Sequence, residues 1–508
     1  MSFQKQLLRL AGSFLLAALA LFPTQLLSQT FSKKNWNVGS SPVKLVRADF
    51  NNDGIDDLAT ANGDGTVTVL LGKGDGTFRR LDASAGQSLL DLVATDLNHD
   101  GHIDLVALNQ ATASTVNLVV LLGNGDGTFQ PPRTVVLPQT PRSLTVADFD
   151  GDGNVDVAVG WNTLGVATPP PSVSHVTIFY GDGSGGFARQ QQIDNVGYPA
   201  QVAQGESSYL LTQIAAADMN RDGRPDLVFV QCCGGFDVEM GAVYMLQNNG
   251  GGSFANVQLS LFSVPRGVTL ADVDQDGFQD LLLPYSGCHT PCSGFLYARN
   301  HQDGTLQAPV NLPQPANTYQ NEDAYSVTAA DVNNDGLKDI ITSIQYYPNT
   351  GSPVYAVAIN KQSANGSFGA PVLIKVDSPG LSSLLWGDFN RDGRADIAGV
   401  NQNGFVTVLL NTTASAGKCA PSSGNDTVHV CVPAANGSAT SPVRFLATPH
   451  ATLHVQAMKI YVDGAASFLT LDDRLSALVQ IAAGTHKITT KAWTATGTFS
   501  KTFTLKVP

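Results

Sequence analysis

The chain has 508 residues, of which 43% are hydrophobic and 14% are charged. This is the composition of a folded globular protein, and the length leaves room for about two or three domains. The formal net charge is −13 at pH 7, and the sequence contains no basic patch. We therefore do not expect nucleic acid as a partner, because its binding depends on clustered Lys and Arg.

Residues 1–28 have the pattern of a secretory signal peptide. Lys5 and Arg9 form a basic start, residues 10–22 form an apolar run, and a small-residue cleavage site follows near Ser28. The apolar run is too short to span a bilayer comfortably, and no later stretch is apolar enough to do so. We expect an exported protein, secreted or at the cell surface, without a membrane span in its mature chain.

A nine-residue pattern, D-x-[DN]-x-D-G-x-x-D followed by an aliphatic residue, organises the sequence. Its seven copies begin at Asp49, Asp96, Asp148, Asp218, Asp272, Asp331 and Asp388. We call these copies loops 1 to 7 and number the positions within each from its first Asp. Successive copies begin 47, 52, 70, 54, 59 and 57 residues apart. Repeats at such spacings indicate a solenoid, a propeller or an array.

Each loop alternates oxygen-bearing side chains at positions 1, 3, 5 and 9, and it has Gly at position 6, where the chain must turn sharply. This arrangement wraps oxygen atoms around a hard divalent cation, so we predict up to seven Ca²⁺ ions, one for each loop. Position 7 is expected to contribute its backbone carbonyl. The predicted ligands are Asp49, Asn51, Asp53, Ile55 and Asp57; Asp96, Asn98, Asp100, His102 and Asp104; Asp148, Asp150, Asp152, Asn154 and Asp156; Asp218, Asn220, Asp222, Arg224 and Asp226; Asp272, Asp274, Asp276, Phe278 and Asp280; Asp331, Asn333, Asp335, Leu337 and Asp339; and Asp388, Asn390, Asp392, Arg394 and Asp396.

An EF-hand shares the first six positions of this pattern, but it requires a bidentate Glu at position 12 and a helix on each side. The residues at position 12 lack a carboxylate: Thr60, Ala107, Val159, Phe229, Leu283, Thr342 and Gly399. The flanking segments are short and β-like, such as residues 43–48 and 58–61 around loop 1. We therefore predict a strand, a calcium loop and another strand in each repeat.

The acidity of the chain is concentrated in these loops. Positions 1, 3, 5 and 9 contain 3+3+4+3+4+3+3 = 23 of the 42 acidic residues. Loss of Lys5 and Arg9 with the signal would change −13 to −15, and seven Ca²⁺ ions would add 14 positive charges, leaving about −1. Ion binding explains the acidity better than a preference for basic partners.

Each repeat continues with further short apolar strands and a Gly-rich turn, which is the content of one propeller blade. The seventh repeat lacks its last strand, whereas Phe31 precedes Asp49 by the same 18 residues that separate Phe78 from Asp96. We therefore predict an all-β fold in which residues 29–413 form a seven-bladed β-propeller closed by the N-terminal strand. Such closure removes exposed sheet edges.

The seven loops and the Gly-Thr-Phe turns, such as residues 76–78 and 127–129, resemble the FG-GAP (VCBS-type) repeat family. The best-known members of this family are the propellers of integrin α-subunits. The resemblance covers residues 29–413 and implies calcium on one face of the propeller and ligand-binding loops on the opposite face. The family includes adhesion receptors, lectins and parts of polysaccharide-degrading enzymes.

Residues 414–427 have the composition of a linker, and residues 428–508 read as short strands of a β-sandwich. The segments 461–464 and 483–486 resemble bacterial immunoglobulin-like modules, which implies a spacer or an accessory binding domain. Trp493 is expected to lie in the core of this sandwich.

The six cysteines of an exported chain indicate disulfides. We expect Cys419 to pair with Cys431, whereas the pairing among the other four, Cys232, Cys233, Cys288 and Cys292, is left open by the sequence. A zinc site formed by Cys288, His289 and Cys292 is the alternative.

No catalytic constellation is visible, because the nine His are scattered and the Asp clusters are explained as ligands. We expect an adhesion or ligand-binding protein, with glycan binding as one version, whose partner is an extracellular protein or a glycan. A carbohydrate-active enzyme (lyase or hydrolase) and a surface-layer component are the alternatives. Trp161, Tyr198, Tyr209, Phe236 and Tyr285 are candidates for stacking on sugar or for local packing.

The loops differ in their expected affinity for calcium. Loops 3 and 5 carry four carboxylates each, so we expect them to bind calcium most tightly. His102, Arg224 and Arg394 occupy position 7, where their side chains need not bind metal and are free to point to solvent, although an Arg beside a carboxylate would lower the local affinity.

Overall fold

The structure is a computed structural model that describes residues 30–112, 115–137, 141–164, 172–197, 209–233, 241–262, 265–286, 293–315, 318–348, 352–413, 427–433, 437–439, 441, 443–450, 455–470, 475–494 and 497–508. The expected signal peptide and nearly all of the expected linker lie outside these ranges. The side chains of all six cysteines also lie outside the described part, as do Tyr198, Phe236 and the side chain of Tyr209.

Every regular element in the described ranges is a β-strand, and six sheets each contain four consecutive strands. The first is β2 (Pro42–Ala48), β3 (Asp57–Asn62), β4 (Thr66–Gly72) and β5 (Phe78–Ser84). The second is β6 (Leu89–Thr95), β7 (Asp104–Gln110), β8 (Val116–Leu121) and β9 (Arg133–Leu137). The third is β10 (Pro141–Ala147), β11 (Asp156–Leu164), β12 (Ser172–Gly181) and β13 (Phe187–Val196).

The next sheets repeat this order along the chain. The fourth is β14 (Tyr209–Ala217), β15 (Asp226–Cys233), β16 (Gly241–Asn248) and β17 (Phe254–Phe262). The fifth is β18 (Thr269–Ala271), β19 (Asp280–Ser286), β20 (Ser293–Ala298) and β21 (Val310–Asn311). The sixth is β22 (Thr318–Ala330), β23 (Asp339–Pro348), β24 (Val354–Asn360) and β25 (Val372–Lys375).

One further four-stranded sheet joins the two ends of this part of the chain. It contains β26 (Ser383–Gly387), β27 (Asp396–Asn401), β28 (Phe405–Asn411) and β1 (Phe31–Asn37), with β1 beside β28. Phe31 pairs with Asn411 and Asn37 pairs with Phe405 in antiparallel register. The Thr412 N–H donates to the Thr30 carbonyl at 2.8 Å, which extends the pairing beyond the strand. The N-terminal strand therefore occupies the place that the last repeat leaves open.

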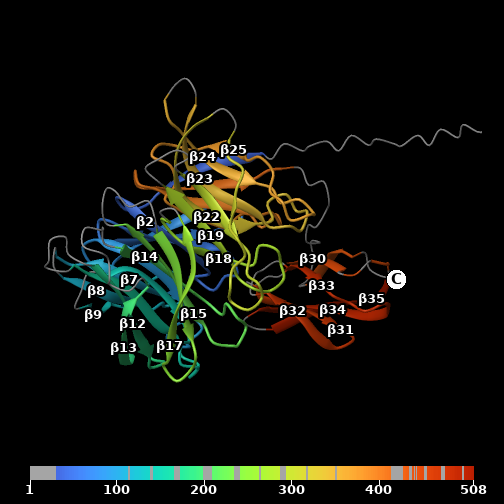
Figure 1. Cartoon of the computed structure of the whole chain (residues 1–508), viewed down its shortest axis with the longest axis horizontal. Coiled ribbons are helices and arrows are strands. Elements are labelled where there is room, and N and C mark those ends of the chain that lie inside the picture. The colour runs from blue at the N-terminus through green and yellow to red at the C-terminus, as the bar shows by residue number, and fades with distance from the viewer. Residues whose placement is uncertain are drawn as a thin grey trace, which may run out of the picture.

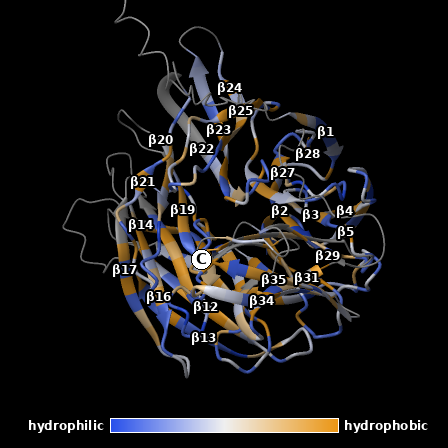
Figure 2. Cartoon of the chain, turned by 90° about the vertical axis from the view of Figure 1, so that its right-hand side faces the viewer, coloured by the Kyte–Doolittle hydropathy of each residue, from blue (hydrophilic) through white to orange (hydrophobic). Residues whose placement is uncertain are grey.

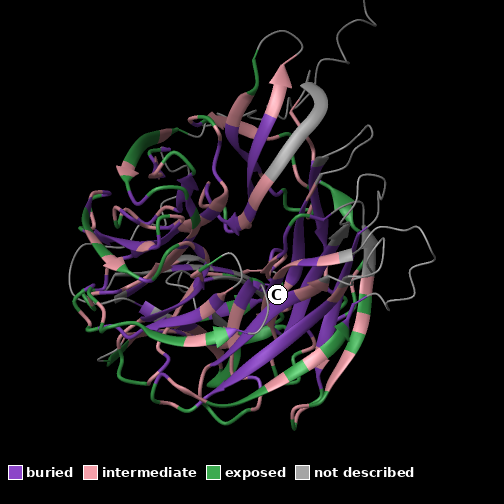
Figure 3. Cartoon of the chain, turned by 90° about the vertical axis from the view of Figure 1, so that its left-hand side faces the viewer, coloured by how far each residue is buried: buried purple, intermediate pink, exposed green. Residues whose placement is uncertain are grey.

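The sheets are arranged in a ring, as expected for a β-propeller (Figures 1 and 2). The first strands of successive sheets contact one another in the order β2, β6, β10, β14, β18, β22 and β26, and β26 contacts β2 again. The middle strands are almost fully buried, as in β3 and β27, whereas the outer strand β5 is largely exposed (Figure 3). Apolar clusters pack between neighbouring sheets, and one of them joins Trp36 of β1 to Phe78 and Phe389.

The last part of the described chain forms two antiparallel sheets. One contains β29 (Thr427–Val432), β30 (Val443–His450) and β33 (Leu475–Val479), and the other contains β31 (Val455–Val462), β32 (Ala465–Thr470), β34 (Gly484–Thr494) and β35 (Gly497–Val507). Buried side chains from both sheets, including Phe445, Ile460 and Leu505, share one core. The immunoglobulin-like assignment of this two-sheet unit stays a prediction.

None of the described residues forms a helix with the length and apolar character needed to cross a membrane.

Candidate metal centre

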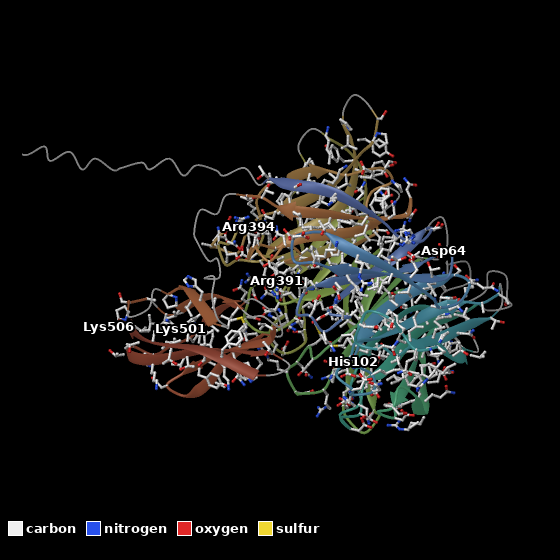
Figure 4. All side chains as sticks on the ribbon, turned by 180° about the vertical axis from the view of Figure 1, so that it is seen from behind. Asp64, His102, Arg391, Arg394, Lys501 and Lys506 are labelled. Atoms are coloured by element: carbon white, nitrogen blue, oxygen red, sulfur yellow. The ribbon has the colours of Figure 1, made fainter. Side chains whose placement is uncertain are left out.

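The seven predicted loops all lie at the same place in their sheets, between the first and second strands. In loop 1, Ala48 at the end of β2 pairs directly with Asp57 at the start of β3. His102, Arg391 and Arg394 belong to loops 2 and 7, and they lie on one side of the ring in Figure 4, whereas Asp64, in the turn after β3, lies on the other side. The loops therefore gather on one face of the propeller.

Position 6 has the backbone conformation that the sequence predicts. Its φ values lie between 78° and 90°, a left-handed region that glycine adopts without steric cost. Each of these glycines also donates its N–H to the Oδ2 atom of the Asp at position 1, for example from Gly54 to Asp49 at 2.8 Å. The first Asp and the turn are thus fixed to each other within each loop: Gly101 to Asp96, Gly153 to Asp148, Gly223 to Asp218, Gly277 to Asp272, Gly336 to Asp331 and Gly393 to Asp388.

Position 4 is a second left-handed residue, and the sequence reasoning missed it. Its φ is positive in all seven described loops: Asn52, His99, Gly151, Arg221, Gln275, Asn334 and Arg391. Several of these side chains reach the next loop around the ring. The Gln275 amide donates to the Gly336 carbonyl at 2.7 Å, and the Arg391 guanidinium donates to the Gly54 carbonyl at 2.9 Å. The absence of β-branched residues at position 4 was the available signal, since such residues rarely adopt positive φ.

Position 9 ties each loop to the third strand of its own sheet or to the turn directly after that strand. Asp57 is fully buried; its Oδ2 accepts the Phe50 N–H at 2.9 Å and its Oδ1 accepts the Gly72 N–H at 2.7 Å. The same pair of backbone bonds recurs at Asp104, Asp156, Asp226, Asp280, Asp339 and Asp396. A carboxylate oxygen has a second acceptor site, so these bonds leave room for a cation.

The carboxyl groups at position 9 have raised pKa values, which a bound cation would lower. Burial, with a smaller contribution from the neighbouring loop carboxylates, raises the pKa of Asp57 and of Asp396 to about 8 and that of Asp280 to about 7. The pKa values of Asp156 and Asp226 are raised to about 6, and those of Asp104 and Asp339 are also raised, chiefly by burial. A cation between the carboxylates would favour their charged form and reverse this effect.

Two unsatisfied oxygen atoms provide a direct test of whether a metal fits. The Oδ1 atoms of Asp96 and Asp272, both at position 1, are buried and have no hydrogen-bond partner among the described residues. An unpaired buried carboxylate oxygen is costly, and a metal ion at the loop would satisfy it. In loops 3 and 5, carboxylate oxygens from positions 1, 3 and 5 also lie within 4.8 Å of one another, so these acidic clusters can hold a metal ion.

Arginine side chains contact the loop carboxylates. Arg224 lies 2.6 Å from Asp222 and Arg394 lies 2.7 Å from Asp392, so these position-7 side chains fold back onto position 5 instead of simply pointing to solvent. From the sequence, these side chains were free to point to solvent. They contact position 5 instead because the two positions lie only two residues apart.

The position-3 carboxylates of the two most acidic loops also have Arg partners, which come from other strands or turns. Arg189 on β13 lies 2.7 Å from Asp150, and Arg299 after β20 lies 3.3 Å from Asp274. The extra negative charge of loops 3 and 5 is therefore partly compensated within the protein.

The described aromatic candidates for sugar stacking take part in local contacts. Trp161 is buried, stacks on His175 at 4.0 Å between ring centroids, and donates its indole N–H to Thr177 at 3.0 Å. Tyr285 donates its hydroxyl to Asn311 at 3.0 Å. Trp161 has the contacts of a packing residue, in agreement with the alternative that its sequence position left open.

The sequence matches a model for an FG-GAP-like repeat at residues 49–107, 96–159 and 218–283. Each match begins at position 1 of one loop and ends at position 12 of the next, so together they include loops 1 to 5. FG-GAP repeats commonly bind calcium and are typical of extracellular proteins. No curated protein matches the chain in sequence.

Solved structures that resemble this chain include one titled as BBS1N in complex with ARL6DN, soaked with lead, and one titled as the Dos1 propeller. The first is 10% identical, with a TM-score of 0.45, over 76% of this chain and 98% of that one. The second is 11% identical, with a TM-score of 0.43, over 73% of this chain and 78% of that one. The family model identifies FG-GAP-like repeats in the chain, and the ring of four-stranded sheets described above is a β-propeller.

Proposed function

We propose that this chain is an exported, calcium-stabilised β-propeller that binds an extracellular ligand, either a protein or a glycan, in an adhesion or lectin-like role. The observation that carries the proposal is the repetition of one acidic loop geometry around a single face of the ring. The loops connect neighbouring strands and neighbouring sheets, so ions bound there would brace the ring. A rigid scaffold of this kind is suited to presenting binding loops.

Calcium is the metal that best fits the donor set. The candidate ligands are carboxylate, amide and carbonyl oxygens, which are the hard donors that Ca²⁺ prefers, and thiolate or imidazole ligands are not part of the pattern. The buried Oδ1 atoms of Asp96 and Asp272 and the raised pKa values at position 9 support a cation at these loops.

We favour binding over catalysis because Asp91, a buried carboxylate that pairs with a lysine in the described part of the chain, already accepts hydrogen bonds at both oxygens. Asp91 lies 3.5 Å from Lys44, which is the kind of pair that a carbohydrate-active enzyme would need. However, its Oδ2 accepts from Ser143 Oγ and Leu144 N–H, and its Oδ1 accepts from Leu92 N–H. A carboxylate held in this way is poorly suited to transfer a proton.

A glycan array screened with the mature chain, once with calcium and once with a chelator, tests the proposal. We expect calcium-dependent retention of a defined set of glycans or, in a parallel screen, of an extracellular matrix protein. Calorimetry on the metal-free chain should show calcium binding. Turnover of a polysaccharide would favour the enzyme alternative, and self-association on calcium addition would favour a surface-layer component.

A further inference from the structure

A cavity of about 360 Å³ lies at the centre of the ring, on the side away from the metal loops. Most of its lining comes from the first strands of the sheets or from the residues just before them, including Lys44 on β2, Arg142 on β10 and Ser383 on β26. The metal loops follow the C-terminal ends of these same strands. All seven sheets of the ring contribute lining residues within the described part of the chain, and the volume falls in the range of about 300–1,000 Å³ that is typical of small-ligand sites.

The charge at this cavity is opposite to that of the chain. Lys44, Arg142 and Arg266 contribute three positive charges and Asp91 contributes one negative charge, which gives +2 for the ionisable lining residues. The whole chain carries −13. An acidic protein generally repels anions, so a local excess of cations around a concave surface focuses the field on anionic ligands.

Most of the polar side chains around the cavity hold neighbouring sheets together. Ser326 Oγ accepts the Leu384 N–H, Gln213 Oε1 accepts the Val268 N–H, and Thr269 Oγ1 donates to the Val327 carbonyl. Lys44 is partly neutralised by Asp91 at 3.5 Å. The lining is thus a pre-organised polar ring whose geometry does not depend on a ligand.

Two groups at the cavity are not used by the fold. Arg142 is exposed, and its guanidinium makes no hydrogen bond or ion pair with any residue that the structure describes. The hydroxyl oxygen of Ser382 is buried and has no hydrogen-bond partner in the described part of the chain. A guanidinium recognises carboxylate and sulfate oxygens, and a hydroxyl can bond to the hydroxyls of a sugar.

We propose that this central cavity binds an anionic sugar through Arg142 and Arg266, with its charge carried by a carboxylate or a sulfate group. The inference rests on the proposed ligand-binding function and specifies the chemistry of the ligand. The site lies on the face opposite the metal loops, so the ions stabilise the ring and do not contact the ligand.

Calorimetry at low ionic strength in the presence of calcium tests this site with three probes: D-glucuronate, glucose 6-sulfate and uncharged D-glucose. We expect binding of one or both anionic probes and no measurable binding of glucose. Arg142→Gln should weaken that binding roughly tenfold, as the loss of a charge-assisted hydrogen bond would. Added salt should weaken it as well.

Lys375→Gln is the matched control, because it removes the same charge from the exposed end of the outer strand β25. It should leave affinity within about twofold of the parent. Arg266→Gln provides a second variant at the cavity, and the thermal unfolding midpoint of each variant confirms folding. Equal affinity for glucose and glucuronate, absence of anion binding, or equal effects of Arg142→Gln and Lys375→Gln would overturn the inference. If neutral glycans are nevertheless retained on the array, the proposed ligand-binding function stands without this site.

Discussion

At the scale of single residues, the loops with four carboxylates differ from loop 4 in how position 5 is paired. In loop 4, Asp222 is held by Arg224 at 2.6 Å, so a cation must compete with the guanidinium. In loop 3, Asp152 bonds to the N–H and the side-chain amide of Asn154, and the Arg partner contacts Asp150 instead. Position 5 is therefore more available to calcium in loop 3.

We predict that Asp152→Ala removes one of the tight sites, whereas Asp222→Ala leaves the tight sites intact. In a calcium titration followed by calorimetry, Asp152→Ala should lower the stoichiometry of the highest-affinity phase, with affinity at loop 3 weakened about tenfold or more. Asp303→Ala, which removes an acid from a turn outside the loops, should behave like the parent. An equal loss of affinity in Asp152→Ala and Asp222→Ala would refute the ranking of the loops.

Some features of the loops can be predicted from the sequence and others cannot. Glycine at position 6 is predictable, because only glycine adopts that conformation without strain and its invariance is visible in seven copies. The bonds of Asp57 to Phe50 and Gly72 are not predictable, since Gly72 belongs to another strand whose register the motif does not specify. The arginine partners of loops 3 and 5 likewise come from distant parts of the sequence, a strand for Arg189 and a turn for Arg299.

At the scale of strands, β1 carries the closure of the ring. Its residues pair with β28 over the whole strand, and Phe31 and Trp36 pack against buried clusters. Thr30 adds a bond from its N–H to Thr413 Oγ1 at 3.0 Å. Without β1, β28 would expose an unpaired edge and part of its apolar surface.

A mature chain that lacks residues 30–37 should therefore be less stable and more prone to associate than one that retains them. We expect the unfolding midpoint in calcium to fall by roughly 5 °C or more, and size-exclusion chromatography to show oligomers. Ser32→Ala, which keeps the strand and alters an exposed side chain, should match the parent. An unchanged midpoint after the truncation would mean that β1 contributes little to closure.

The strands themselves were the most predictable level of the structure. The short apolar segments around each loop correspond to real strands, such as β2 and β3 around loop 1, because buried middle strands leave continuous apolar runs in the sequence. The pairing of β1 with β28 could be anticipated from the missing strand of the last repeat. The contacts between neighbouring sheets were harder to predict from the sequence. The residues at position 4 and in the first strands differ in type from one repeat to the next, so they form no pattern that the sequence would reveal.

At the scale of the whole molecule, the two faces of the ring have opposite electrostatic character. The loop face gathers 23 of the 42 acidic residues, whereas the cavity at the other end of the same strands has a lining of +2. The composition gives only the net charge of the chain, so this difference between the two faces cannot be read from it. It becomes visible only when the topology places Lys44, Arg142 and Arg266 from different sheets around one opening.

The loop face also makes stability depend on pH in a way that calcium should reverse. The folded-state pKa values of Asp57 and Asp396 are raised to about 8, against an ordinary value of 3.8, chiefly by burial. Between these two values the folded chain binds more protons than the unfolded chain. In the absence of metal, this part of the stability is therefore fully present below about pH 4 and is lost as the pH rises toward 8.

Bound calcium favours the ionised carboxylates and lowers these pKa values, so it should remove most of that loss. We predict that the unfolding midpoint of dialysed, metal-free chain falls between pH 5 and pH 8, while that of the calcium-saturated chain changes little or rises. The stabilisation by calcium, measured as the difference between the two midpoints, should be larger at pH 8 than at pH 5. Magnesium at equal concentration is the control, since it demands a smaller octahedral site and should stabilise less. A difference that is the same at both pH values would show that the buried carboxylates at position 9 are not coupled to the ion.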